Sequence, residues 1–385
     1  MMTVVMVGHK GVPSRSGGIE RHVEELSAAL AMRGLRVISF DRKWYVEDES
    51  PIRGVIRRWS FGIRTKHLDA ITHTLSAIFL SLRERPNIIH IHGVGPALLS
   101  PIARLLHPRA RVVVTFHCVD RTHAKWGWFA RKMLWIGEAF SCFFAHRTIT
   151  VSDGLARYCL DTYECQSSVI PNGVRVERGT DPVHLEPFGL KSKQYLAMVT
   201  RLIPHKNIHV AMEAHQLLAS RRPELAEAYP LVIVGGSAFT NEYEHELQTF
   251  VKDYPHVVMT GSQFNESLRA LQEHAGVHLS VSSSEGMSIS LLESMAMARP
   301  VIVSDIPENT EVVEGDAYVV RTNDAQALSH ALESMLDLEA VERDAMGERL
   351  RKRVEAKHDW YRIADQTCEI YHEVLPPKRV LRYAA

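Results

Sequence analysis

The sequence predicts an α/β protein with two doubly wound parallel-sheet domains. Short apolar runs typical of buried strands alternate with longer helical patterns along the whole chain. The chain has 385 residues, more than one hydrophobic core usually fills, so two domains of roughly 170 to 200 residues are expected. The alternation also restarts in the second half, after a loose polar stretch that ends near residue 193.

The expected strands and helices follow from these apolar runs in order. In the first half, strands are expected at residues 4–7, 37–40, 88–91, 112–116 and 148–151, with helices between them such as 20–33. In the second half, strands are expected at residues 194–200, 230–236, 256–261, 277–282 and 300–305. The domain boundaries are therefore placed at 1–173 and 174–358. The last segment, 359–385, reads as a helix and tail that could pack anywhere, including back against the N-terminal domain.

Composition excludes several classes of protein. No run approaches the roughly 20 apolar residues that a membrane span requires, and the chain starts directly in a strand-like run, so no signal peptide is expected. The five cysteines form no CxxC pair, which is typical of a protein from the reducing cytoplasm. Residues 1–172 carry 23 Lys and Arg against 14 Asp and Glu, whereas the remainder carries 22 against 31. This asymmetry suggests that one domain meets an anionic partner or surface.

Two glutamates stand out in "SSSEGMSISLLESMAMARPVIVSD", residues 282–305. The strand–helix–strand pattern places Glu285 in the loop before a helix and Glu293 about a turn and a half inside it. In open α/β sheets this loop lies where ligands bind. Each glutamate also has an ordinary explanation, since Glu285 could stabilise the helix dipole and Glu293 could simply face water.

Two further segments have the composition of phosphate-binding loops. In "SRSGGIERHVEEL", Gly17 and Gly18 precede a helix whose first backbone N–H groups could bind an anion. In "TRLIPHKN", Arg201 and Lys206 follow the first strand of the second domain and could neutralise a diphosphate. Two glycines are also common in an ordinary turn, and such cations are often only solvated surface charges.

The order of these motifs resembles that of the retaining glycosyltransferases of family 4, which have the GT-B fold. The resemblance covers nearly the whole chain and also includes "TFH", "ITVSDGL" and "IPNGV". It implies two Rossmann-like domains facing a cleft, with the acceptor bound by domain 1–173 and a nucleotide-sugar donor by domain 174–358. By the resemblance, Glu293 binds the donor ribose and Glu285 the donated sugar. The remaining donor-binding residues that it implies are Gly17, Gly18, Arg201, Lys206, Gly286, Met287 and Ser288.

The resemblance also implies the catalytic groups. Glu285, Arg201 and Lys206 are expected to act on the sugar and the leaving diphosphate, and His117 matches the family's cleft histidine beside the anomeric carbon. His9, His90 and His92 are expected to be structural or to line the cleft. No metal ligands appear at recognisable spacing, so we expect no metal ion and no cofactor besides the donor.

Two positions depart from the family pattern, in which glycines are common. Ser288 keeps the backbone N–H that a phosphate would use. Ala298 is expected to matter only for packing.

The acceptor side carries a mixture of cations and aromatic residues. "RTHAKWGWFARKMLW", residues 121–135, is typical of a helix on an anionic membrane, and "IRGVIRRWSFGIRTK", residues 52–66, adds five further cations and a tryptophan. The expected acceptor or membrane surface consists of Lys125, Trp126, Trp128, Arg131 and Lys132. The alternative is a helix whose aromatic face belongs to the core. The segment also resembles transferases that build cell-surface polysaccharides, which implies a glycan or lipid-linked acceptor and a cytoplasmic protein that could lie on the inner face of the plasma membrane. Nucleic acid is not an expected partner, because no known binding motif accompanies the charge.

Three rival functions can be compared with this one. An NAD-dependent enzyme is disfavoured because no G-x-G-x-x-G follows either first strand. A sugar-nucleotide epimerase with the GT-B fold would need further acid and base residues. A catalytically silent subunit that binds lipid or a partner would not need Arg201, Lys206, Glu285 and Glu293. The sequence leaves the nucleotide base, the sugar and the acceptor open.

Overall fold

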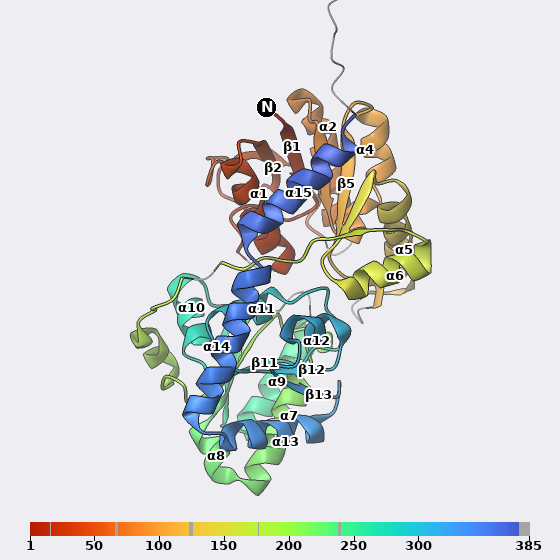
Figure 1. The fold of residues 1–385 in the computed structure, drawn as a ribbon. Helices are drawn as coiled ribbons and strands as arrows, with labels where there is room; N and C mark the ends of the chain where they lie inside the picture. Colours follow the sequence, from red (N-terminus) through yellow and green to blue (C-terminus); the bar gives the residue numbers. More distant parts are fainter. Residues whose placement is uncertain (16, 66–67, 123–125, 176, 238–239, 377–385) are drawn as a thin grey trace, which may run out of the picture. The chain divides into compact units, whose positions relative to one another are not determined.

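The computed structural model describes residues 1–15, 17–65, 68–122, 126–175, 177–237 and 240–376. They form two compact units, each built on a parallel sheet (Figure 1), so the prediction of two doubly wound α/β domains is confirmed. Of the described residues, the N-terminal unit contains those within 1–121, 128–171 and 361–376, and the C-terminal unit contains those within 122–127 and 172–360.

The N-terminal unit has a seven-stranded sheet with the order β3-β2-β1-β4-β5-β6-β7. Its strands are β1 (Thr3–Val7), β2 (Arg36–Arg42), β3 (Ile56–Ser60), β4 (Ile88–His92), β5 (Arg111–Phe116), β6 (Arg147–Thr150) and β7 (Ser168–Val169). Its helices are α1 (Gly18–Met32), α2 (Asp69–Leu80), η1 (Ser81–Glu84), α3 (Val94–Ala97), α4 (Ser100–Leu106), α5 (Trp128–Phe143) and α6 (Asp153–Tyr163), and η2 (Asp120–Thr122) follows β5. The central strands β1 and β5 are mostly apolar because helices cover both faces of a parallel sheet, whereas β4 carries the buried His90 and His92.

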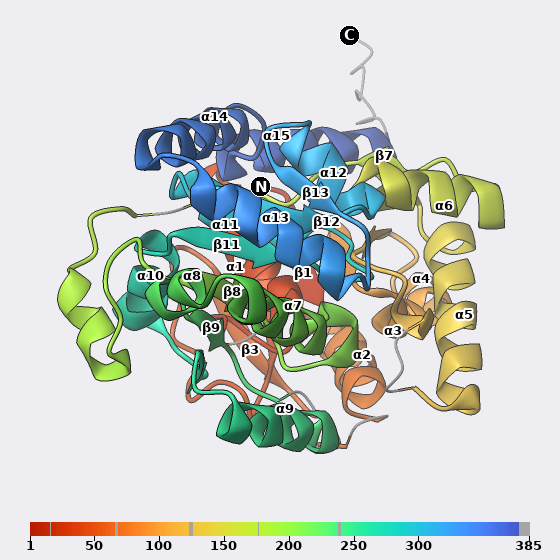
Figure 2. The same ribbon diagram turned by 90° about the horizontal axis from the view of Figure 1, so that it is seen from below.

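The C-terminal unit has a six-stranded parallel sheet with the order β10-β9-β8-β11-β12-β13. Its strands are β8 (Leu196–Val199), β9 (Leu231–Val234), β10 (Val257–Gly261), β11 (Val277–Ser280), β12 (Val301–Ser304) and β13 (Tyr318–Val320). Its helices are η3 (Pro182–Phe188), η4 (Pro204–Lys206), α7 (Ile208–Arg221), α8 (Pro223–Ala228), α9 (Asn241–Asp253), α10 (Asn265–Glu273), α11 (Ile289–Ala296), α12 (Pro307–Val313), α13 (Ala325–Asp337) and α14 (Ala340–Lys357). Helices α7 and α13 lie side by side (Figure 2) and pack on the core of buried Leu, Ile, Val and Met side chains.

The last helix, α15 (Trp360–Val374), belongs to the N-terminal unit, although the helix before it belongs to the C-terminal unit (Figure 1). Tyr371 of α15 is fully buried, and its hydroxyl lies 2.7 Å from Nδ1 of His90 on β4. Arg33 at the end of α1 pairs with Asp365, and Arg147 donates a hydrogen bond of 2.9 Å to Glu373. Helix α15 thus completes the unit that also contains β1.

In each sheet, later strands are added first on one side of the first strand and then on its other side, so the strand order changes direction at one switch point. In the N-terminal unit this place lies between β1 and β4, and in the C-terminal unit it lies between β8 and β11. Loops leaving the carboxyl ends of two such strands separate to opposite faces, and open α/β sheets bind ligands in the space between these loops. Ligands are therefore expected at these two switch points.

Among the residues that the structure describes, no helix combines the length and the apolar character needed to cross a membrane.

Candidate active site

Helix α11 of the C-terminal unit begins at a cap formed by Ser288. Ser288 has extended backbone angles, and its side-chain oxygen accepts a hydrogen bond of 3.3 Å from the backbone N–H of Leu291. The serine at this departure from the family pattern therefore starts the helix, as N-cap serines commonly do. Glu285 lies in the loop between β11 and α11, and Glu293 is the fifth residue of the helix. Both positions agree with the spacing argument.

Lys206 and Glu285 meet at the switch point of the C-terminal sheet. Lys206 ends η4, which follows β8, and β8 is the sheet neighbour of β11. The Lys206 ammonium forms an ion pair with Glu285 Oε1, which also accepts a hydrogen bond of 2.8 Å from the Ser282 hydroxyl. The two side chains of the pair are only 13% and 11% exposed. A cation and a carboxylate are thus held together beside the N-terminus of α11.

The other predicted donor-site cation and carboxylate occupy different positions. Arg201 lies in the loop between β8 and η4, with its side chain exposed to solvent. Glu293 Oε2 accepts a hydrogen bond of 3.1 Å from the amide of Gln272, a buried residue of α10. Sequence reasoning missed Gln272, because no pattern in the sequence distinguishes this residue from other polar residues of a helix.

The loop before α11 is held in place by the "IPNGV" segment. The Asn172 side-chain amide donates a hydrogen bond of 2.9 Å to the Met287 carbonyl, and the Asn172 backbone N–H lies 3.3 Å from the Met287 sulfur. His358 Nδ1 lies 2.8 Å from the Asn172 carbonyl in turn. Gly286 and Met287 are buried. The motif quoted for the resemblance therefore supports the loop that carries Glu285.

The N-terminal switch point carries the glycine pair. Gly17 caps α1 with a φ of 102°, and a Cβ atom at Gly17 would lie 2.2 Å from a carboxylate oxygen of Glu20. A side chain at residue 17 would therefore be strained both in its backbone and in its contact with Glu20. Gly18 is the first residue of α1 and is exposed.

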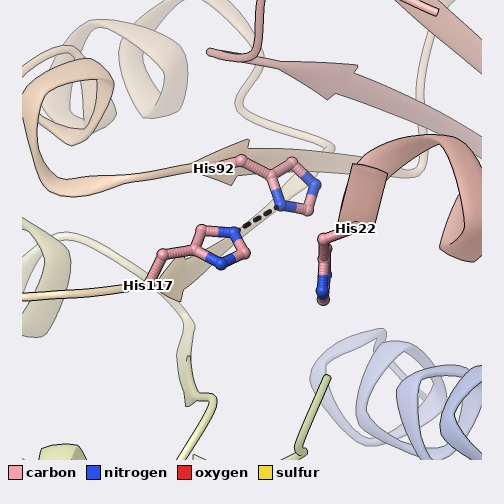
Figure 3. Close-up of side chains that lie close together, drawn as sticks. All are labelled: His22, His92 and His117. Carbon is pink, nitrogen blue, oxygen red and sulfur yellow. Dashed lines mark hydrogen bonds between the residues drawn. The ribbon is translucent and has the colours of Figure 1, made fainter. Parts of the chain in front are cut away.

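His117 lies directly after β5, buried among other histidines (Figure 3). Its Nε2 lies 3.3 Å from Nδ1 of His92, the last residue of β4, and its ring centroid lies 4.7 Å from that of His22 on α1. Burial is the main cause that lowers the pKa of both His92 and His117 well below the usual value, and the neighbouring histidines lower both further. Both imidazoles are therefore neutral at physiological pH.

Two of the histidines expected to be structural or to line the cleft have polar partners within the N-terminal unit. His9 Nε2 lies 2.7 Å from the Ser39 hydroxyl and 3.3 Å from Asp41. His90 lies 2.7 Å from both Thr115 Oγ1 and the Tyr371 hydroxyl, and burial lowers the pKa of His90 to about 3. His92 differs, because its ring contacts His117 itself.

The predicted acceptor surface is exposed along α5. The side chains of Trp128 and Phe129 are 76% and 69% exposed, and Trp135 is 49% exposed. Arg131 is exposed as well, and the exposed Lys132 ammonium lies 5.6 Å from the Trp128 ring centroid. The alternative of an aromatic core face does not hold for these residues, although Trp126 is half-buried. Lys125 lies outside the described residues.

A second aromatic and cationic surface lies near β3 of the N-terminal unit. A cavity of about 570 Å³ is lined by Lys43, Trp44, Trp59, Ser60, Phe61, Gly62 and Arg64. The Lys43 ammonium lies 5.1 Å from the centroid of the Trp59 ring, and the Arg64 guanidinium lies 4.8 Å from that of Trp44. These residues belong to or lie beside the basic segment 52–66.

Comparison with known proteins identifies the family. The chain matches the family described as Glycosyltransferase Family 4 over residues 16–178 and that described as Glycosyl transferases group 1 over residues 184–353. It is 24% identical to the O-antigen chain mannosyltransferase C of Escherichia coli, covering 98% of this chain and 100% of the relative. It is 25% identical to the E. coli UDP-Gal:alpha-D-GlcNAc-diphosphoundecaprenol alpha-1,3-galactosyltransferase, covering 79% and 80%.

Solved structures share the fold over nearly the whole chain. Sucrose-phosphate synthase from Thermosynechococcus elongatus superposes with a TM-score of 0.80 at 19% identity, covering 97% of this chain and 99% of that one. Anabaena Alr3699/HepE in complex with UDP-glucose gives a TM-score of 0.77 at 16% identity, covering 97% and 100%. Together with the two family matches, these similarities show that the chain belongs to the GT-B-fold glycosyltransferases of family 4, group 1.

Proposed function

We propose that this glycosyltransferase moves a sugar from a nucleotide-diphosphate donor to a glycan or lipid-linked acceptor, with retention of the anomeric configuration and without a metal ion. The observation that carries the proposal is the group formed by Lys206, Glu285 and the N-terminus of α11, with Glu293 one turn further along the helix. A helix N-terminus and a cation favour a diphosphate, while carboxylates accept hydrogen bonds from sugar hydroxyls.

In this mechanism the donor diphosphate lies against Lys206, Arg201 and the first N–H groups of α11. These groups stabilise the negative charge that develops when the bond between the anomeric carbon and the phosphate oxygen breaks. The acceptor oxygen forms its new bond on the same face of the sugar, and its proton passes to a leaving phosphate oxygen. No protein base is needed for this step, and the cations perform the neutralisation that a divalent ion performs in other transferases.

In this proposal, the His117 side chain lies beside the anomeric carbon of the donor sugar. As a neutral imidazole, His117 can accept a hydrogen bond from a sugar hydroxyl, and its backbone carbonyl can face the positive charge that develops on the sugar ring. The low pKa that burial gives to His117 supports this role, because a protonated imidazole would oppose that positive charge.

The acceptor is proposed to belong to a cell-surface polysaccharide or glycoconjugate. The names of the two E. coli relatives support this assignment, since one acts on O-antigen chains and the other on a diphosphoundecaprenol-linked sugar. The exposed face of α5 supports an acceptor held at an anionic membrane, on which the protein would be peripheral, because its tryptophans and cations match such a surface.

The donor is tested first by thermal shift of the full chain with UDP, GDP, ADP and dTDP. A nucleotide present at 100 times its Kd stabilises the folded state by about 2.7 kcal/mol, so the preferred base gives the largest rise in Tm. Anabaena Alr3699/HepE was solved with UDP-glucose, which makes UDP the first nucleotide to test. If none of the four nucleotides raises the Tm, the proposal of a nucleotide-sugar donor is wrong.

Calorimetry with the preferred nucleotide diphosphate then distinguishes the roles of Glu293 and Glu285. Glu293→Ala should weaken binding by about 1.5 to 3 kcal/mol, the scale of a hydrogen bond to a charged group. Glu285→Ala should leave binding of the free nucleotide diphosphate nearly unchanged and depress transfer of the sugar. Equal losses of binding in both variants would mean that the two roles are wrongly assigned.

Product analysis distinguishes transfer from the rival chemistry. With donor and acceptor present, the proposal expects a glycosylated acceptor of retained configuration, formed at the same rate with and without EDTA. Conversion of the nucleotide sugar into an epimer without an acceptor would instead identify an epimerase. Loss of activity in EDTA with recovery on addition of Mg²⁺ or Mn²⁺ would contradict the metal-free mechanism.

A further inference from the structure

Three histidines from separate segments meet at the carboxyl end of the N-terminal sheet (Figure 3). His22 comes from α1, His92 ends β4, and His117 follows β5, the sheet neighbour of β4. All three side chains are buried, with residue exposures of 3%, 1% and 7%. One nitrogen from each ring lies within 4.8 Å of the other two. Within the described residues, this is the group of His, Cys, Asp or Glu side chains that could hold a metal ion.

The distance between His92 and His117 suits a shared metal ion. Nitrogens bound to one tetrahedral zinc ion at about 2.05 Å lie about 3.3 Å apart, and His92 Nδ1 lies 3.3 Å from His117 Nε2. A hydrogen bond between the two rings occupies the same distance when no ion is bound. The His22 nitrogen lies within 4.8 Å of the other two, so it has to approach by at most about 1.5 Å to complete the set.

The surroundings of the His92 ring indicate a site of moderate affinity. Tight zinc sites usually orient each ligating histidine with a hydrogen bond from its second nitrogen to a carboxylate or carbonyl. The second nitrogen of His92 lies 3.5 Å from the sulfur of Met6, which is a weak acceptor. Three imidazoles with one open position can bind zinc, but this partner orients His92 poorly, so we expect reversible binding.

We propose that His22, His92 and His117 bind a transition metal ion of the zinc class and that the bound ion inhibits sugar transfer. The inhibition rests on the proposed function, in which His117 accepts a hydrogen bond from a sugar hydroxyl. An ion on His117 Nε2 would leave the proton on the other ring nitrogen, so that His117 could no longer accept this bond. The binding itself does not depend on that function. The protein would then be active without a metal ion and inactive with zinc.

Binding is tested on the full chain after dialysis against EDTA and then against buffer without chelator. Calorimetric titration with ZnCl₂ should show one ion per chain with micromolar affinity, and Co²⁺ should give the visible absorption of a tetrahedral complex. His22→Ala should weaken zinc binding at least 10-fold, whereas His22→Cys, which restores a metal ligand, should bind zinc again. The matched control is His107→Asn, which replaces another buried histidine of the same unit, hydrogen-bonded to Ser81, and should bind zinc like the wild type.

The results separate the metal site from the proposed function. Zinc binding that is unchanged in His22→Ala, or absent from the folded wild type, would overturn the metal site even if transfer is efficient. If the site exists, zinc should inhibit the wild type at the concentration at which it binds, EDTA should restore transfer, and zinc should not change the rate of His22→Ala relative to its own zinc-free rate. Binding that depends on His22 in a protein without any transferase activity would support the site and refute the proposed function.

Discussion

Ala298 ends helix α11 in the left-handed region of the backbone, with a φ of 58°. The backbone N–H of Arg299 donates to the carbonyl of Ser294, which closes the helix in the way that usually requires glycine at the left-handed position. The family pattern has glycine there, and the expectation that Ala298 matters only for packing was wrong. A Cβ atom in this conformation costs about 1 kcal/mol or more.

Replacing Ala298 by glycine should therefore stabilise the C-terminal unit. The free energy of strain that glycine relieves exceeds the free-energy cost of the extra backbone entropy that glycine loses on folding. Ala298→Gly should therefore raise the free energy of unfolding by about 0.5 to 1 kcal/mol. Ala296→Gly, in the right-handed last turn of the same helix, should lower the free energy of unfolding by about 1 kcal/mol. Urea unfolding of both variants is the measurement, and destabilisation of equal size in both would contradict the strain at Ala298.

Lys206 should matter for catalysis more than for folding. Lys206→Ala removes the cation assigned to the diphosphate, so kcat should fall by about 10²- to 10³-fold. The change in the free energy of unfolding should remain under about 2 kcal/mol, since Glu285 keeps its hydrogen bond from Ser282. Lys193→Ala is the matched control, because Lys193 forms an exposed pair with Asp344. A similar loss of kcat in the control would contradict the role of Lys206.

At the scale of elements, α15 should stabilise one unit without affecting the other. Tyr371→Phe removes the hydroxyl that contacts the buried His90 of β4, which should cost about 1 to 3 kcal/mol. Hydrogen exchange should then become faster in β4 and β5, while β8 and β11 keep the exchange rates of the wild type. Tyr361→Phe, at an exposed position on the same helix, should change neither sheet. Faster exchange in both sheets after Tyr371→Phe would contradict a local effect.

The exposed face of α5 should bind anionic membranes. Each cation near such a surface contributes about 1 kcal/mol at low salt, so Arg131→Gln with Lys132→Gln should weaken binding to anionic vesicles by up to about 2 kcal/mol. Co-sedimentation at low and high salt measures this loss, and nucleotide binding should stay unchanged. Lys191→Gln with Lys193→Gln, in the C-terminal unit, serves as the control. If the wild type does not bind anionic vesicles at low salt, the exposed face of α5 is not a membrane-binding surface.

The central strands and the edge strand β10 were predictable from sequence, whereas the edge strands β3, β7 and β13 were not. Central parallel strands are buried on both faces and therefore read as continuous apolar runs. Strand β3 contains Arg57 and Arg58, and β7 and β13 have only two and three residues. At such edges the apolar pattern is short or broken by charges that find partners elsewhere, as Arg57 does with Asp41 of β2.

Some contacts of the candidate site were likewise predictable from sequence, and others were not. The positions of Glu285 and Glu293 follow from the period of one loop and one helix, so their spacing in the sequence was informative. The contacts of His22, His92 and His117 arise only when three distant segments meet at the end of a sheet. Because the three histidines are far apart in the sequence, their spacing does not indicate that they lie close together, and no metal-ligand pattern was expected there. The contacts of Gln272 with Glu293 and of Asn172 with Met287 were missed for the same physical reason.

At the scale of the whole molecule, buried histidines should make stability fall as the pH falls. Burial lowers the pKa of His90 to about 3 and that of His215 and His278 to about 4. Below the unfolded pKa of about 6.5, the unfolded chain binds protons that the folded chain does not. Each of these histidines therefore contributes stability that is complete above about pH 6.5 and is lost toward its folded pKa, by about 1.4 kcal/mol per pH unit.

Urea unfolding of the C-terminal unit between pH 7.5 and 5 measures this dependence, with hydrogen exchange to assign the unit that unfolds. His278→Gln removes one of these groups and should reduce the slope of unfolding free energy against pH by about one proton. His330→Gln, at an exposed position on α13, should leave the slope unchanged. An unchanged slope in His278→Gln would mean that His278 is not held neutral by burial.

The return of α15 to the N-terminal unit also sets an order for folding during synthesis. All strands of that unit leave the ribosome before the C-terminal unit is made, yet Tyr371, which covers His90, is translated after the whole C-terminal unit. Domains usually fold as they emerge, the first one first. Here the first unit has to wait with part of its core uncovered, and the second unit can be complete before the first is closed. A nascent chain arrested before residue 360 should therefore show a protected C-terminal sheet beside an N-terminal sheet still open to proteases and chaperones.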